Sequence, residues 1–245
     1  MTQVKDILDC PCLPVLEEDI YEFFDRHLNK KGFTVAINAE KILRYSSDLE
    51  LKTIIDNSFL PYPDGAGAVL GLSWLHGKKS EKINMPIIAL NYANNNSLKT
   101  FIVGSDQNNH DIAINNIKEE YQNINLVGNL HGFHDPDYIY NEISIKQPDI
   151  ILLAMGSPLQ EKFALNLINY LDTGIIIGCG GALDIIAGKL KRAPSFWINN
   201  NLEWLYRVIQ EPWRYKRQLF LPKFFISLIY AVCKKKLKTF LEKRF

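Results

Sequence analysis

One carboxylate is placed where it could carry out acid–base chemistry. Asp64 lies between Pro63 and Gly65, directly before a run of small residues that begins at Ala66. A carboxylate on a loop that faces the ends of the strands can act as a general base and take a proton from a hydroxyl group. The same position suits an ordinary helix N-cap, whose side chain accepts backbone N–H bonds. Both interpretations agree with the local sequence.

Glycine and small polar residues recur at five turns of the chain, and such turns can bind phosphate. The backbone N–H groups of a glycine turn that opens a helix can approach a phosphate closely. The tight turn alone explains any single glycine, but five such turns together favour a nucleotide site. The turns contain Asn38, Gly104, Gly128, Gly156 with Ser157, and Gly180.

Several other motifs are absent or incomplete. The runs 65–70 and 178–183 begin G-x-G but end in leucine, which disfavours a dinucleotide-binding fingerprint, and no P-loop occurs. The string from Asp135 to Asp137 formally spells D-x-D, but proline in a first helical turn with acids near it favours a helix start. Cys10 and Cys12 are too close in sequence for the usual zinc spacing. We expect no metal site.

The elements that would position these residues alternate along the chain. Apolar runs at 33–37, 101–103, 124–127, 150–155 and 174–177 predict strands, and several are continuously apolar, as buried parallel strands are. Helical spacing occupies 39–56, 66–76, 110–121, 158–171 and 182–189. The alternation predicts an α/β fold with a mostly parallel, Rossmann-like sheet flanked by helices. Ligands then bind beyond the carboxyl ends of the strands.

The 245 residues carry a net charge of only +1, but the charge is unevenly distributed. Residues 204–245 contain eleven basic and two acidic residues, a net charge of +9, which leaves −8 for the first 203 residues. The basic residues of this tail alternate with Phe, Leu and Ile, which favours an amphipathic helix on an anionic membrane surface over a merely solvated basic helix. An acidic body disfavours nucleic acid as a partner.

Targeting signals are not evident in the sequence. The first nine residues lack the apolar region of a signal peptide, and no stretch reaches the roughly 20 apolar residues that span a bilayer. Four scattered cysteines disfavour a disulfide framework. We therefore expect a protein that is cytoplasmic or lies on a membrane surface.

Five motifs, in order from about residue 33 to residue 219, resemble those of the WecG/TagA/CpsF glycosyltransferases (glycosyltransferase family 26). The motifs are VAINAEK at 35–41, PDG at 63–65, AMGSPLQEK at 154–162, GGALD with GKLKRAP at 180–194, and LEWLYR with EP and RYKR at 202–217. The wording of the first, third and fifth is most similar to members that transfer N-acetylmannosaminuronic acid in enterobacterial common antigen synthesis.

The resemblance implies an inverting, metal-independent transferase without a cofactor. Such an enzyme moves an N-acetylmannosamine-type sugar, with N-acetylmannosaminuronic acid the first candidate, from UDP to undecaprenyl-diphosphate-GlcNAc in cell-surface polysaccharide synthesis. It further implies a catalytic domain over 1–195 and, over 196–245, a C-terminal helical appendage that closes the active site and binds the membrane through 218–245. A homo-oligomer is possible within this family pattern.

The resemblance also implies roles for individual residues. Asp64 matches the base that deprotonates the acceptor hydroxyl. Guanidinium groups suit the diphosphate, because bidentate donors stabilise the charge that grows on the leaving group. The substrate-binding positions that match are Asn38, Gln160, Asp184, Arg207, Arg214 and Arg217.

One segment departs from the family pattern. Where members carry an arginine and then a Gly-x-Asp element, this chain has 82–86, Lys-Ile-Asn-Met-Pro. The departure leaves the cation for a donor carboxylate unassigned, so another UDP-hexose donor is an alternative, as is a non-catalytic nucleotide-binding protein of the same fold. His131 is interpreted as a loop residue with local hydrogen bonds, Cys179 as a buried residue at a strand end, and Trp204 and Tyr206 as packing residues.

Overall fold

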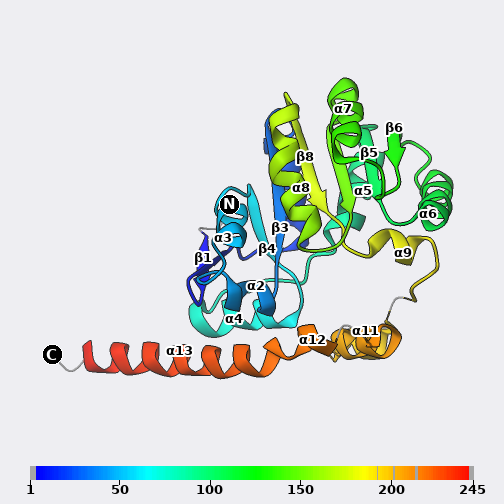
Figure 1. Cartoon of the computed structure of the whole chain (residues 1–245). Helices are drawn as coiled ribbons and strands as arrows, with labels where there is room; N and C mark the ends of the chain where they lie inside the picture. Colours follow the sequence, from blue (N-terminus) through cyan, green and yellow to red (C-terminus); the bar gives the residue numbers. More distant parts are fainter. Residues whose placement is uncertain (1–3, 192, 201, 213–214, 243–245) are drawn as a thin grey trace.

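The computed structural model describes residues 4–191, 193–200, 202–212 and 215–242. Its centre is a six-stranded, fully parallel sheet in the order β4-β3-β8-β7-β5-β6 (Figure 1). The strands are β3 (Lys31–Ile37), β4 (Leu60–Pro63), β5 (Lys99–Gly104), β6 (Asn125–Leu130), β7 (Ile150–Ala154) and β8 (Gly174–Gly178). The predicted parallel α/β fold is confirmed.

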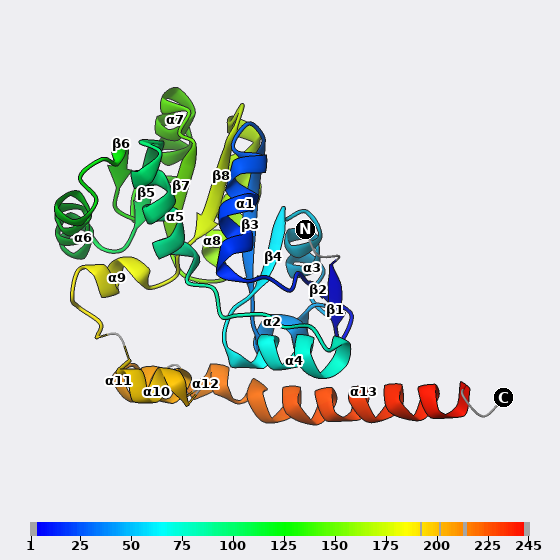
Figure 2. The same cartoon turned by 180° about the vertical axis from the view of Figure 1, so that it is seen from behind.

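Helices cover both faces of the sheet, and each face has its own hydrophobic core (Figures 1 and 2). One face is covered by α2 (Ala39–Arg44), α3 (Leu49–Asp56), α4 (Ala66–His76), α7 (Pro136–Lys146) and α8 (Leu159–Leu167) with the 3-10 turn Ile168–Tyr170. The other is covered by α1 (Glu17–His27), α5 (Met85–Asn95), α6 (Gln107–Glu120) and α9 (Ala182–Ile186). Along β7, Ile151 and Leu153 enter one core, whereas Ile150 and Leu152 enter the other. This alternation explains why the strand is apolar throughout.

Strand β4, which immediately precedes Asp64, was not expected from the sequence. Pro61 and Pro63 argue against a strand, because proline cannot donate a ladder hydrogen bond. β4 is tolerated because it is the edge strand, paired on one side with β3. On the other side, the Pro61 carbonyl accepts the Leu13 N–H at 2.7 Å. The short N-terminal hairpin of β1 (Lys5–Ile7) and β2 (Cys10–Cys12) lies beyond this edge.

The predicted helix at 39–56 is wrong as a single element. It is divided into α2 and α3, because Asp48 caps a new helix by accepting the Leu51 N–H at 3.0 Å. Arg44 of the first helix also binds Asp48 at 2.6 Å. A carboxylate that can accept backbone bonds at a helix start competes with continuation of the helix.

The described residues of the C-terminal segment form four helices that run beneath the carboxyl edge of the sheet (Figure 1). They are α10 (Ser195–Asn199), α11 (Glu203–Gln210), α12 (Tyr215–Gln218) and α13 (Phe220–Glu242). The predicted helical appendage is present. Its division from residues 1–195 as a separate domain stays a prediction.

Helix α13 is fixed to the body by two fully buried side chains, Phe224 and Leu228, and packs on α2 and α4. A Cβ placed on Gly67 of α4 would lie 3.2 Å from the Phe224 ring. The small residues that follow Asp64 therefore leave room for this aromatic ring. Burial of two such side chains contributes about 3–6 kcal/mol to the docking of α13.

Candidate active site

Asp64 lies at the carboxyl end of β4, at the edge of the sheet above the C-terminal helices. Its backbone N–H donates to the Ile37 carbonyl at 2.8 Å, which fixes the turn against β3. The N-cap of α4 is Gly65, at φ +82°, and no side chain caps this helix. The N-cap interpretation of Asp64 is therefore wrong, and its carboxylate is exposed rather than used for local structure.

The surroundings of Asp64 raise the pKa of its carboxyl group. Desolvation by the protein around it is the main cause, and Glu203 acts in the same direction. The cations Arg207, Lys41 and Lys82 oppose the shift. Because the side chain remains open to solvent, the shift reflects the crowding of protein atoms around it rather than complete enclosure. A raised pKa makes the ionised carboxylate a stronger base, which suits a general base.

Two predicted binding residues, Asn38 and Gln160, have clear structural roles. The Asn38 side chain caps α2 by accepting the Lys41 N–H at 3.0 Å. Gln160 is buried in the first turn of α8, and its oxygen accepts the Gly180 N–H at 2.9 Å. A Cβ on Gly178 would lie only 2.4 Å from the Gln160 amide nitrogen. Gln160 therefore holds the loop after β8 against the loop after β7.

The glycine turns after β5 and β7 are in contact with each other. Gly104 has φ +138°, and a Cβ there would lie 2.3 Å from the backbone oxygen of Ala154, so a side chain is excluded. Next to it, Ser105 donates to Asp184 at 2.7 Å, which links this turn to α9. Gly156, at φ +77°, opens the turn that leads through Ser157 to α8. The fold thus places Gly104 against Ala154 and joins Ser105 to Asp184, while the binding roles of Gly104, Gly156, Ser157 and Asp184 stay predictions.

Gly128 is not at a turn, and the expectation that it opens a loop is wrong. Strand β6 continues to Leu130, with Gly128 paired to Phe101. A Cβ on Gly128 would lie 2.3 Å from the Phe101 ring. The glycine makes room for an aromatic neighbour, which removes the basis for its predicted phosphate contact.

The three predicted arginines are described to different extents. Arg207 is on α11 and forms an ion pair with Glu203 at 3.0 Å. Its charge is the largest favourable electrostatic influence on the Asp64 carboxylate, so this part of α11 lies near Asp64. Arg214 lies outside the described residues, as does the side chain of Arg217.

The other candidate residues, Asp135, Asp137 and His131, have mainly structural roles. Asp135 is the N-cap of α7 and accepts the Asp137 N–H at 2.9 Å, which confirms the helix start over a metal-binding D-x-D. The His131 ring accepts the Phe133 N–H at 3.2 Å, a local bond as expected, and stacks on His134. Among the described residues, no three His, Cys, Asp or Glu side chains form a group that could hold a metal.

Two expectations for semi-buried residues need correction. Cys179 is only partly buried, although desolvation still raises the pKa of its thiol. Tyr206 packs beside Trp197, as expected. Trp204, in contrast, is exposed, because α11 is covered by the body on one side only.

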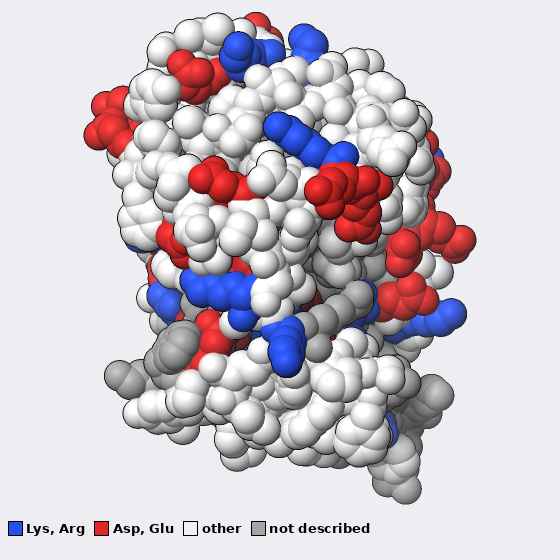
Figure 3. All heavy atoms as spheres, turned by 90° about the vertical axis from the view of Figure 1, so that its right-hand side faces the viewer, with Lys and Arg blue, Asp and Glu red and all other residues white. Residues whose placement is uncertain are grey.

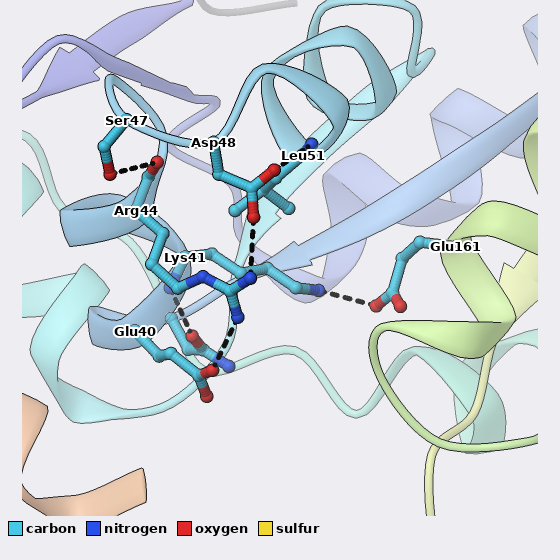
Figure 4. Close-up of polar contacts among 8 residues, drawn as sticks. Glu40, Lys41, Arg44, Ser47, Asp48, Leu51 and Glu161 are labelled. Atoms are coloured by element: carbon cyan, nitrogen blue, oxygen red, sulfur yellow. Dashed lines mark hydrogen bonds and ion pairs between the residues drawn. The ribbon is translucent and has the colours of Figure 1, made fainter.

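The sequence interpretation missed an ion pair that connects two of the motifs. Lys41 of α2 and Glu161 of α8 are both buried, with Nζ and Oε1 2.6 Å apart (Figure 4). They border a hollow between α2, α3 and α8, which Asn38 and Ser157 also line. Glu161 directly follows Gln160, and Lys41 lies three positions after Asn38, so their place in the same two motifs is the sequence signal that could have indicated them.

Comparison with known proteins shows the family to which this chain belongs. A profile described as the Glycosyl transferase WecG/TagA/CpsF family matches residues 5–239, so the chain belongs to this family of glycosyltransferases. The chain is 30% identical over 241 residues to the N-acetylglucosaminyldiphosphoundecaprenol N-acetyl-beta-D-mannosaminyltransferase of Bacillus subtilis (strain 168). The match covers 94% of this chain and 93% of that protein.

Proposed function

We propose that this chain transfers an N-acetylmannosamine-type sugar from UDP to undecaprenyl-diphosphate-GlcNAc, with Asp64 as the base. Asp64 takes the proton from the acceptor hydroxyl as that oxygen bonds to C1 of the donor sugar. The bond from C1 to the UDP oxygen breaks, and UDP leaves with the electron pair. Attack opposite the leaving group inverts the anomeric carbon. The name of the Bacillus subtilis relative supports the sugar and the acceptor.

The observation that carries the proposal is the environment of Asp64. The carboxylate is exposed at the carboxyl edge of the sheet and is not used as a helix cap. It interacts electrostatically with Arg207, which lies on α11. A base must be ionised and accessible, and a guanidinium nearby can stabilise the departing diphosphate. Arg214 and Arg217 are assigned to the same task on the family pattern alone.

The strand order suggests how the donor lies. From β4 to β5 there are four strand spacings, which amount to about 19 Å along the carboxyl edge. We assign the sugar to the Asp64 end and the nucleotide to the end formed by Gly104, Gly156 and Asp184. A glycine turn such as the one at Gly156 can present backbone N–H groups to a phosphate.

The donor sugar is proposed to be N-acetylmannosaminuronic acid, with N-acetylmannosamine and other UDP-hexoses as tested alternatives. A uronic acid donor requires a cation for its carboxylate. Lys82 is exposed on the loop before α5, and its charge acts on Asp64. Its Nζ lies 3.4 Å from the Ile198 carbonyl of α10, so it spans the space between body and appendage. We assign this cation role to Lys82.

We further propose that the enzyme works on the inner face of the cytoplasmic membrane and binds it through α10–α13. The described part of the chain has no helix long and apolar enough to cross a membrane. Below the charged body, the surface formed by the C-terminal helices shows few charged groups (Figure 3). Its exposed apolar side chains include Phe196, Ile209, Leu219, Ile226 and Tyr230.

Exposed lysines accompany this apolar surface on α13. Lys234, Lys236 and Lys238 are all solvent-exposed near the end of the helix. Each such charge contributes about 1 kcal/mol to attraction by anionic lipid. Apolar insertion and charge attraction together favour a surface-bound enzyme whose acceptor is lipid-linked.

The experiment is a donor panel with matched variants. Purified protein is incubated with UDP-N-acetylmannosamine, UDP-N-acetylmannosaminuronic acid or UDP-glucose and a short polyprenyl-diphosphate-GlcNAc, and UDP release is measured. Asp64→Asn should lower the rate at least about 100-fold, whereas the exposed Asp137→Asn should not change it. Chelation with EDTA should leave the rate unchanged. Absence of UDP release with every donor, or full activity in Asp64→Asn, contradicts the proposal.

The donor assignment has its own control. Lys82→Met should reduce kcat/KM for the uronic acid donor more than for N-acetylmannosamine, since only the former carries a carboxylate. An equal loss with both donors contradicts the assignment of Lys82 to that carboxylate.

A further inference from the structure

The buried ion pair between Lys41 and Glu161 stands at the carboxyl edge of the sheet, beside the strand that holds the Asp64 turn. The two side chains are only 6% and 4% exposed, and Nζ lies 2.6 Å from Oε1 (Figure 4). The same Nζ donates to the Ala36 carbonyl at 2.8 Å. One ammonium group therefore connects α2, α8 and the end of β3.

The direction of the β3 carbonyls places this ammonium on the side of β3 that faces β8. The Ile37 carbonyl points toward β4, where it accepts the Asp64 N–H. Successive carbonyls of a strand point to opposite sides, so the Ala36 carbonyl points toward β8. The pairing of β3 with β8 ends at Thr34, so β8 does not reach this carbonyl. The Lys41 ammonium therefore donates to the Ala36 carbonyl where a backbone N–H of β8 is not available.

Stability alone does not account for the pair. Two buried charges lose their hydration, and apolar residues of similar size often stabilise a fold as well. The second oxygen of Glu161, Oε2, is buried and has no hydrogen-bond partner among the described residues. The pair is therefore incompletely satisfied, in contrast to the exposed pair of Lys162 and Glu50, at 2.7 Å, which joins α8 to α3.

Lys41 differs from the other charged groups around Asp64 in being enclosed. The other charged groups that act on Asp64 are Arg207 and Glu203 on α11 and Lys82 before α5. The phenol of Tyr62 on β4 also interacts electrostatically with Asp64. Arg207 is paired with Glu203 on the same helix, and Lys82 is exposed, whereas Lys41 is buried beside Glu161. Among the described residues, Glu161 is the carboxylate that forms an ion pair with Lys41.

We propose that Lys41 and Glu161 are positioning residues that set the charge state of Asp64: the ammonium favours its carboxylate, and Glu161 limits that effect. The inference rests on the proposed role of Asp64 as the base. Lys41 and Glu161 therefore have opposite effects on the ionisation of Asp64. Loss of the Glu161 charge leaves Lys41 uncompensated and favours the Asp64 carboxylate, whereas loss of the Lys41 charge disfavours it.

The test compares Glu161→Gln with Lys41→Met, which retain side-chain volume. The midpoint of the acid limb of kcat/KM should fall by roughly 0.5–1 pH unit in Glu161→Gln and rise by a similar amount in Lys41→Met. The ¹³C titration of the Asp64 carboxyl, assigned by its loss in Asp64→Asn, measures the same shift without turnover.

Matched controls are Lys162→Met and Glu50→Gln, which break an exposed ion pair between α8 and the neighbouring helix α3. Neither should move the midpoint by more than about 0.2 pH unit. Opposite shifts in the two buried variants support the proposal. Shifts of the same sign, no shift in folded variants, or failure of both variants to fold overturn it. Absence of transferase activity in the wild type would refute the proposed function instead, since the titration still reports on the pair.

Discussion

Replacement of Phe224 by alanine should release α13 from the body. Phe224 and Leu228 are the fully buried side chains of this helix, and they enter the core formed with α2 and α4. Their burial is worth about 3–6 kcal/mol together. Phe→Ala substitutions in cores cost about 3–5 kcal/mol. A loss of about 3 kcal/mol lowers the ratio of docked to undocked helix by more than 100-fold, so little docking energy remains.

Amide hydrogen exchange of residues 220–242 measures this release directly. In Phe224→Ala, exchange in α13 should accelerate by at least about 100-fold while strands β7 and β8 keep their protection. The control is Ile226→Ala on the same helix, because Ile226 is 70% exposed and its truncation should change exchange little. Equal exchange in the two variants would refute the conclusion that Phe224 anchors the appendage.

Three further predictions address stability, the loop after β8 and membrane binding. Because folding raises the Asp64 pKa, the ionised carboxylate destabilises the folded state at neutral pH. Asp64→Asn should therefore have a higher melting temperature than the wild type at pH 7.5. This difference in melting temperature should vanish as the pH falls below about 4. Thermal unfolding followed by circular dichroism at both pH values checks the sign. Gly178→Ala should displace the Gln160 amide and lower kcat/KM about tenfold or more, whereas Ala182→Gly, in the neighbouring helix, should have a smaller effect, as steady-state kinetics would show. Ile226→Ser with Tyr230→Ser should reduce co-sedimentation with phosphatidylglycerol vesicles without changing the melting temperature; unchanged sedimentation contradicts a membrane-facing α13.

The fold class could be predicted because its signal is local. Strands buried on both faces must be apolar at every position, so runs such as 150–155 and 174–177 identify themselves. The helix start at Asp135 is equally local, since capping involves residues two or three positions apart. β4 was missed for the opposite reason. Its prolines argue against a strand, and only the edge position makes them acceptable.

The candidate site could be predicted only in part. Motifs drew attention to Asp64, Asn38 and Gln160, but their roles differ once neighbours are known. Asn38 caps a helix, and Gln160 holds the Gly180 loop from 20 positions away. Gly128 has the composition of a turn, yet a contact with Phe101 explains it. Composition alone does not distinguish a glycine that admits a ligand from one that admits a side chain.

By itself, the sequence determined the parallel α/β class, the family, the acidic body and the basic, apolar tail. These follow from periodicity, motif order and net charge, which depend on the order of residues along the chain and not on contacts between distant segments. Only the tertiary structure decided that the tail is anchored through Phe224 on α4, and that Lys41 meets Glu161 across 120 positions. Such contacts depend on strand order and on which helix faces are buried, and no local propensity encodes them. The electrostatics around Asp64 therefore follow from the packing of segments that are far apart in the chain.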